Sequence, residues 1–329
     1  MRNHQKIWTQ FAVVATLVAG MSAQAQTSDA SSNYPNKTIR IVVPFAAGGV
    51  SDVLARMLGQ KLGEVWKQPV VIENKPGADG NLGADVVSKA TPDGYTVLLV
   101  DTSTITTSPL LMARMTYDPL KDLQPISLLT FSPYGLVVNP SVPVKTFKEL
   151  VLFGKNNPGK LNFSAGTMGH KLAAAQLASA FGIQWTTVPY RGGAAALNAV
   201  VAGEADVTVV GLMSALPQIQ GQRVRGLATT GSTRTSAAGE LPTLGEAGIQ
   251  KLVMGSWQGL FAPKGTPAAV VNKLNTGFVA ALNDLTIKPK LAAQGTEIIG
   301  DTPEQFRAFL ASDAKRWKIV ATEAGIQPE

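Results

Sequence analysis

Cysteine is absent from the 329 residues. Without thiols the chain can form no disulfide and no thiolate metal site, and it has no cysteine to carry a lipid anchor. Such a protein must rely on its apolar core, and 45% hydrophobic residues in a chain of this length are enough for one. The 29 basic and 22 acidic side chains are scattered. Because no run of Lys and Arg with interleaved aromatic residues occurs, nucleic acid is not an expected partner.

Histidine is scarce, with His4 and His170 as the two examples. His4 lies in a segment that we expect to be removed, so a single imidazole remains, and no G-x-S-x-G motif is present. A histidine metal site would need partners that the sequence does not supply. The glycine-rich stretch PFAAGGVSD, residues 44–52, matches neither G-x-G-x-x-G nor G-x-x-x-x-G-K-[ST]. We therefore expect no enzymatic activity, no metal, no nucleotide and no other cofactor.

Long hydrophobic runs are also missing, and no segment approaches the roughly 20 apolar residues of a membrane helix. The N-terminus instead combines Arg2 and Lys6, a short apolar stretch FAVVATLVAG, and small residues at Ala23 and Ala25. This order is typical of a secretory signal peptide. We predict a signal peptide over residues 1–25 and a mature protein in the periplasm, without a direct membrane anchor.

Strand-like and helix-like segments alternate through the rest of the chain. The apolar runs IRIVVPF, PVVIENK and YTVLLVD are separated by stretches of helical periodicity, which predicts a parallel sheet with helices on both faces. A strand-rich stretch broken by Ser132 and Pro133 leads into a second α/β set, and GSWQGLFAP returns from it. We expect two α/β lobes joined by two crossing strands: residues 26–126 and 251–329 in lobe 1, and residues 127–250 in lobe 2.

Two helices close the predicted chain, and both have start signals. The first is expected to begin with Thr266 as its cap and Pro267 at the first helical position. The second begins with Thr302, and Gln305 three residues later completes a capping box. We expect these helices to pack back on lobe 1.

Three segments share one design, in which an apolar strand is followed by a turn of small residues and then a helix. They are VVPFAAGGVSD, NFSAGTMGH and VPYRGGAAA. Each would point the free N–H groups of a helix N-terminus beyond the carboxyl end of its strand, where open α/β sheets bind ligands. This favours a carboxylate or phosphate held between the lobes. Arg191, at the rim of the third turn, is either a bidentate carboxylate ligand or a solvated loop residue. Asp52 is interpreted as a first-turn acid that stabilises its helix.

Several blocks of the chain, in order, resemble the Bug-type (TctC-like) solute-binding receptors of tripartite tricarboxylate transporters. They include YPNKTIRIVVPFAAGGVSDVLAR, VVIENKPGADGNLGADVVSKATPDGYTVLL, MTYDPLKDLQPIS, NPGKLNFSAG, VPYRGGAAALNAVVAGEADV, LPTLGEAG and WQGLFAPKGTP. The resemblance implies a two-lobed, hinged periplasmic-binding-protein fold of class II type, with the ligand cleft between the lobes. It also implies a monomer that captures a small carboxylate and passes it to membrane permease subunits.

The resemblance, together with the three turns, implies a set of ligand-binding residues. They are Phe45, Ala46, Ala47, Gly48, Gly49, Thr102, Ser103, Ser132, Tyr134, Ser164, Ala165, Gly166, Thr167, His170, Tyr190, Arg191, Gly192, Gly193, Val210 and Met213.

Two positions depart from the pattern common in the family. Arg191 stands where members often have Lys, and Val210 stands where many have an acidic residue. Without that acid a bound ammonium group would lack a partner, and Val210, Met213, Phe45 and Tyr134 would form an apolar wall. We therefore expect an aromatic or apolar dicarboxylate, such as a phthalate-type acid. An aliphatic di- or tricarboxylate is the alternative ligand, a co-sensor for a two-component system is the alternative role, and an exported hydrolase is least favoured.

Overall fold

The computed structural model describes residues 33–249, 252–323 and 325–328. The predicted signal peptide, residues 1–25, lies outside the described residues. Residues Lys37–Glu329 form one compact unit, and the following description concerns this unit. Within the described ranges, no helix combines the length and the apolar character that a membrane crossing requires.

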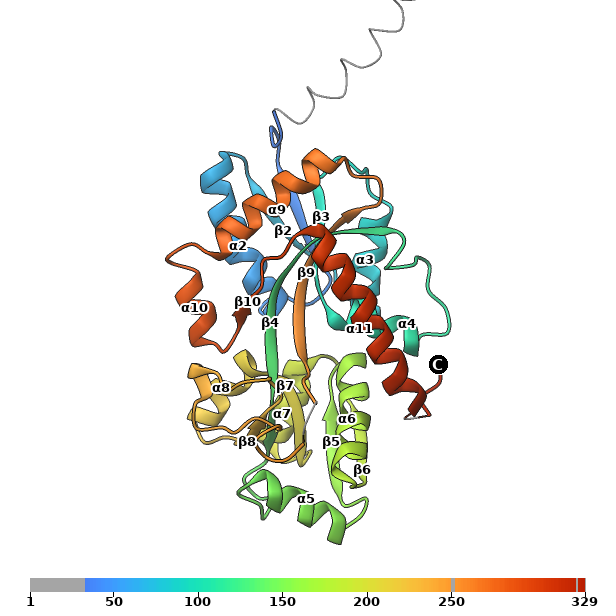
Figure 1. The fold of residues 1–329 in the computed structure, drawn as a ribbon, viewed down its shortest axis with the longest axis vertical. Helices are drawn as coiled ribbons and strands as arrows, with labels where there is room; N and C mark the ends of the chain where they lie inside the picture. Colours follow the sequence, from blue (N-terminus) through green and yellow to red (C-terminus); the bar gives the residue numbers. More distant parts are fainter. Residues whose placement is uncertain (1–32, 250–251, 324, 329) are drawn as a thin grey trace, which may run out of the picture. The chain divides into compact units, whose positions relative to one another are not determined.

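The first sheet has the predicted parallel βαβαβ beginning (Figure 1). Its strands run in the order β2-β1-β3-β9-β4, where β1, β2 and β3 are parallel and β9 and β4 join antiparallel. Apolar β-branched residues dominate β1, and all but one of its five residues are buried, as befits a strand covered on both faces. The strands are β1 (Ile39–Val43), β2 (Val70–Asn74), β3 (Thr96–Asp101), β4 (Leu123–Val138) and β9 (Gly255–Pro263).

Helices cover both faces of this sheet (Figure 1). Helix α2 buries Leu54, Leu58 and Leu62, which recur at intervals of four residues and so share one side of the helix. On the opposite face, residues of β1, β3 and β9 pack with α3 and α11 around Trp257 and Phe306, whose rings meet edge to face. The helices are α2 (Val50–Trp66), α3 (Asn81–Ser88), α9 (Ala268–Leu282) and α11 (Pro303–Glu323).

The second sheet contains the C-terminal part of β4 with β7, β5 and β6, and β8 also pairs with β4. Its main core cluster includes Phe163, Phe181 and Leu177. The strands are β5 (Leu161–Ala165), β6 (Trp185–Pro189), β7 (Val207–Gly211) and β8 (Arg225–Thr229). The helices are α5 (Phe147–Asn156), α6 (Met168–Phe181), α7 (Gly193–Ala202) and α8 (Leu212–Gln220).

Strand β4 belongs to both sheets. It pairs with β9 as far as Pro133 and with β7 from Tyr134 onward. The predicted break at Ser132 and Pro133 was wrong, because β4 is one strand of 16 residues. Pro133 is tolerated there because it lies where one set of pairings ends and the next begins, so its missing N–H interrupts neither ladder. The lobe boundaries at 126/127 and 250/251 stay a prediction.

Short elements complete the fold, and the two predicted helix starts have different outcomes. At α11, the Thr302 N–H donates to Gln305 Oε1 at 2.9 Å and the Gln305 N–H donates to Thr302 Oγ1 at 3.2 Å, which confirms the capping box. At α9, Pro267 is the N-cap and Thr266 donates its hydroxyl proton to the Pro263 carbonyl, so the predicted Thr266 cap was wrong by one residue. The short elements are η1 (Ala78–Gly80), η2 (Ser103–Thr107), α4 (Ser108–Leu111), η3 (Ser236–Ala238), α10 (Lys288–Ala293) and β10 (Glu297–Ile298).

Candidate functional site

The turn between β1 and α2 is open to solvent. Phe45 is half-buried, whereas residues 46–49, Ala46, Ala47, Gly48 and Gly49, are exposed. Gly48 has a φ of 85°, in the left-handed region where a glycine is favoured. Gly49 is the N-cap of α2, and no described side chain caps the helix there. The first N–H groups of α2 therefore begin at an exposed turn, as the sequence predicts.

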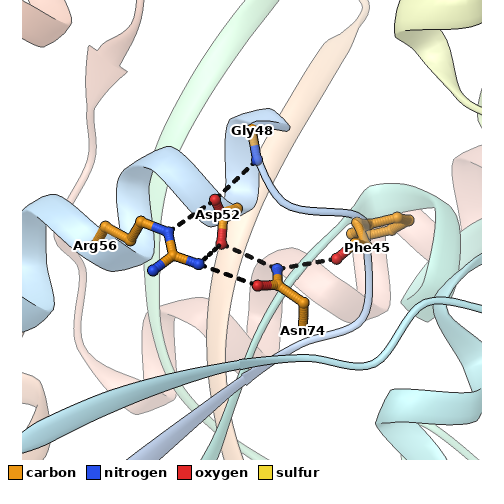
Figure 2. A network of polar contacts seen from close by, with 5 residues as sticks. All are labelled: Phe45, Gly48, Asp52, Arg56 and Asn74. Atoms are coloured by element: carbon orange, nitrogen blue, oxygen red, sulfur yellow. Dashed lines mark hydrogen bonds and ion pairs between the residues drawn. The ribbon is translucent and has the colours of Figure 1, made fainter.

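Asp52 holds this turn in place (Figure 2). Its carboxylate accepts the Gly48 N–H at 2.9 Å, the Asn74 amide at 2.9 Å and Arg56 Nε at 3.0 Å. The Asn74 amide also donates to the Phe45 carbonyl at 3.0 Å. Burial alone would raise the pKa of Asp52, but the hydrogen bonds from Arg56, Gly48 and Asn74 lower it below its usual value. Asp52 thus does more than stabilise its helix, because it takes one of the turn's N–H groups for itself.

The two second-sheet turns touch each other through glycines. The Gly192 N–H donates to the Gly166 carbonyl at 2.7 Å, and a Cβ on Gly166 would lie 2.3 Å from the Gly192 carbonyl oxygen. Real Cβ atoms do not approach backbone so closely, so position 166 requires glycine. The N-termini of α6 and α7, which follow these turns, are consequently neighbours.

The N-termini of α6 and α7 differ in how they are satisfied. At α6, Thr167 caps the helix by accepting the His170 N–H at 3.2 Å, and the Met168 N–H donates to the Asp79 carboxylate at 3.1 Å. At α7 the N-cap is Gly192, and no described side chain caps it. Of the three turns, those before α2 and α7 therefore offer the better anion positions, since their helices lack side-chain caps.

His170 and Tyr134 meet beside the Gly166 turn. Their rings pack edge to face with centroids 5.4 Å apart, and the His170 Cε1 atom lies 3.1 Å from where a Gly193 Cβ would be. The Gly166 N–H points to His170 Nδ1 at 3.4 Å, so Nδ1 is the acceptor and the proton of the neutral ring is on Nε2. Burial lowers the pKa of His170 to about 4 and raises that of Tyr134. Both side chains are thus neutral at ordinary pH.

A polar row lies where β4 and β9 pair. Ser51, from the first turn of α2, donates to Gln258 Oε1 at 2.6 Å, and Gln258 Nε2 donates to Ser256 Oγ at 3.3 Å. Ser256 pairs directly with Ser132, whose buried hydroxyl has no hydrogen-bond partner among the described residues. Since the amide can only donate through nitrogen, the Ser256 hydroxyl accepts from it and keeps its own proton to donate elsewhere.

The end of β3 carries a partly buried acid, Asp101. Asp101 accepts hydrogen bonds from the N–H and hydroxyl of Ser103, and burial raises the pKa of Asp101 despite them. Thr102 accepts the Trp257 N–H at 3.0 Å. Both Thr102 and Ser103 are buried, at 2% and 3% exposure, and their side chains are used in these contacts. Their role in the structure is therefore to fix the backbone after β3.

The remaining predicted ligand-binding residues differ in how far they are buried. Ser164 donates its hydroxyl proton to the Ala196 carbonyl at 2.8 Å, and Ala165 is part of the second-sheet core, so both side chains are occupied by packing. Val210 is 1% exposed within a cluster that also contains Val137 and Leu197, and Tyr190 packs against that cluster from outside. Val210 is therefore buried in the packing beside the third turn, and its contact with a ligand stays a prediction. Met213 is half-buried near the start of α8, and Arg191 is exposed.

Sequence reasoning missed four residues that the structure joins to the turns: Asp79, Ser51, Ser256 and Gln258. The two polar pairs Ser51–Gln258 and Asp79–Met168 are separated by 207 and 89 residues. No local spacing could reveal such contacts. The only available signal was the turn sequence PGADG around Asp79, where glycines flank an acid. As for metals, no three His, Cys, Asp or Glu side chains gather as possible ligands within the described part of the chain.

Comparison with known proteins gives consistent similarities. The sequence model of the tripartite tricarboxylate transporter family receptor, TctC, matches residues 54–326. Protein BugT of Bordetella pertussis is 32% identical over 319 residues, which cover 95% of this chain and 97% of BugT.

Several solved structures are similar to this structure over most of the chain. Rpa4515 of R. palustris with adipate has a TM-score of 0.86 and 32% identity, covering 90% of this chain and 100% of that one. Periplasmic binding protein BugD has a TM-score of 0.82 and 31% identity, with coverages of 90% and 100%. MatC of Rhodopseudomonas palustris with bound malate has a TM-score of 0.80 and 30% identity, with coverages of 87% and 99%. The predicted periplasmic-binding-protein fold is confirmed, and the similar proteins are binding proteins rather than enzymes.

Proposed function

The chain belongs to the tripartite tricarboxylate transporter receptor family and is a solute-binding receptor, and we propose that its ligand is a small dicarboxylate with an apolar or aromatic body, of the phthalate type. The observation that carries this proposal is the pair of glycine N-caps at α2 and α7, which no described side chain caps. Each supplies backbone N–H groups and the positive end of a helix dipole, which suit one carboxylate.

The groups around these turns support a ligand with an apolar middle. Phe45 lies in the turn before α2 and is half-buried, and the buried ring of Tyr134 packs against His170; neither Phe45 nor Tyr134 carries a charge. The buried Ser132 hydroxyl, which lacks a partner among the described residues, is a hydrogen-bond donor for a ligand oxygen. Arg191 is exposed and can close on the second carboxylate with its planar, bidentate guanidinium group.

An aliphatic dicarboxylate is the second candidate. It is favoured by the similar structures with adipate and with malate, because each of these ligands carries two carboxylates. The two candidates share the same pair of anion positions and differ only in the body between them.

Calorimetric titration of the purified protein tests whether the ligand needs two carboxylates. We expect phthalate-type acids or adipate to bind at least tenfold more tightly than benzoate, which has only one carboxylate. At a ligand concentration of one hundred times Kd, the protein should gain about 2.7 kcal/mol of stability. Tighter binding of benzoate than of every dicarboxylate would refute the two-carboxylate proposal.

The role of Arg191 is tested by Arg191→Ala, with Arg223→Ala as the matched control. Both arginines are exposed and lie in the second-sheet half of the chain. We expect Arg191→Ala to weaken dicarboxylate binding by about tenfold, in line with the loss of one charge-assisted pair, whereas Arg223→Ala should leave it unchanged. Equal affinities for the two variants would remove Arg191 from the site.

We further propose that the protein is exported, is cleaved after Ala25 and delivers its ligand to the permease subunits of a tripartite transporter. The order of charged, apolar and small residues at the N-terminus supports export. N-terminal sequencing of the periplasmic protein tests the cleavage. Uptake of labelled ligand by cells with the permease, with and without this protein, tests the delivery, and uptake that is independent of the protein would refute it.

A further inference from the structure

Asp79 connects the two sheets at the site. It belongs to η1, which leads from β2 into α3, yet its carboxylate accepts the N–H of Met168 at the start of α6, at 3.1 Å. The Asp79 backbone is held in the left-handed region, with a φ of 51°, and its carbonyl accepts the Thr104 hydroxyl at 3.0 Å. Asp79 is therefore aimed at α6 by a backbone conformation that its own sheet supports.

The position that Asp79 occupies is one where a ligand carboxylate would otherwise fit. The N-terminus of α6 is next to that of α7, because Gly166 and Gly192 are joined by a 2.7 Å hydrogen bond. A molecule held at α7 could thus extend a further carboxylate to α6. The contact with Met168 shows that a carboxylate binds at α6, and this carboxylate belongs to the protein.

The surroundings of Asp79 also oppose a second anion. Burial and, to a lesser extent, the nearby Asp101 carboxylate raise the pKa of Asp79 to about 7, although the hydrogen bond from the Met168 N–H opposes the rise. The other titratable groups that act in this region are Tyr134 on β4 and His170 on α6, which are neutral, and Asp313 and Arg316 on α11, which form an ion pair with each other at 2.7 Å. No cationic side chain among the described residues forms an ion pair with Asp79. A ligand carboxylate placed here would meet negative charge without a compensating partner.

We propose that Asp79 is a specificity-determining residue, which fills the carboxylate position at the N-terminus of α6 and so excludes tricarboxylates in favour of dicarboxylates. The inference rests on the proposed function, since it concerns the size and charge of the same ligand. It separates two classes of acid that the uncapped helices α2 and α7 alone would not distinguish.

The direct test is Asp79→Gly, with propane-1,2,3-tricarboxylate and adipate as probes. Glycine suits the left-handed φ of this position, so the backbone of η1 is preserved. We expect the variant to bind the tricarboxylate at least tenfold more tightly than the wild-type protein does, with a change of less than threefold for adipate. Asp79→Asn retains the side-chain shape and should gain less than Asp79→Gly, because its amide oxygen still accepts the Met168 N–H.

Controls separate this inference from the proposed function. Glu204→Gln removes an exposed acid just beyond α7 and should leave both affinities unchanged, which excludes a general effect of net charge. If the wild type and Asp79→Gly both bind adipate, but Asp79→Gly binds the tricarboxylate no more tightly than the wild type does, the role of Asp79 is refuted while the proposed function stands. If the wild type binds no dicarboxylate, the proposed function and this inference both fail. The melting temperature of each variant confirms that it is folded.

Discussion

Replacing Asp52 by alanine should remove the hydrogen bonds that hold the exposed turn between β1 and α2. The carboxylate is 2% exposed and accepts hydrogen bonds from Gly48, Asn74 and Arg56. A hydrogen bond to a charged group contributes about 1.5 kcal/mol or more, and two such donors come from the turn and the neighbouring strand. The half-exposed Arg56 contributes little, roughly 0.2–1 kcal/mol. We therefore expect Asp52→Ala to lower the free energy of unfolding by about 3 kcal/mol.

Urea denaturation of Asp52→Ala and of Asp85→Ala measures this effect with a matched control. Asp85 also pairs with a basic residue four positions later, Lys89, but both groups lie nearer the surface. Its loss should cost less than about 1 kcal/mol. The lowered pKa of Asp52 means that its contribution is present above pH 4 and is lost as the pH falls through the lower, folded-state pKa. Equal costs for the two variants, or a wild-type difference that is unchanged at pH 2, would refute the account.

Three further predictions follow from the second-sheet turns and η1. Gly166→Ala should destabilise the protein by about 1–3 kcal/mol, because its Cβ would meet the Gly192 carbonyl, whereas Gly239→Ala has open space and should be neutral in the same denaturation assay. His170 should remain neutral above pH 5, because burial lowers its pKa to about 4, and an imidazole NMR signal that titrates near pH 6.5 would contradict this. The raised pKa of Asp79 means that the folded protein holds its proton more tightly than the unfolded chain, so stability falls as the pH rises from about 4 to 7. Asp79→Asn should show a smaller fall in stability over this pH range. If the stability of the variant has the same pH dependence as that of the wild type, this prediction is wrong.

The sequence predicts the parts of the site that depend on neighbours along the chain. The turn after β1 and the capping box of Thr302 and Gln305 are both local patterns, and the structure places them as expected. The sequence does not reveal contacts that a side chain makes with a partner far along the chain. The burial of Val210 against residues of α7 and α8 depends on how these helices pack on β7, and the sequence of the strand alone does not show it. Likewise, the contact between Asp79 and Met168 requires both sheets to be assembled.

Strand β4 has a consequence for how the protein can assemble. Its 16 residues pair with β9 in one sheet and with β7 and β8 in the other. Each sheet is therefore incomplete until this one strand is in place. A fragment of residues 127–249 would contain most of β4 but not its partner β9, so the N–H and C=O groups of β4 that pair with β9 would be left unpaired. We therefore expect that neither half folds alone. Unfolding in either half reaches the other through a shared backbone, and we expect a single cooperative transition instead of two.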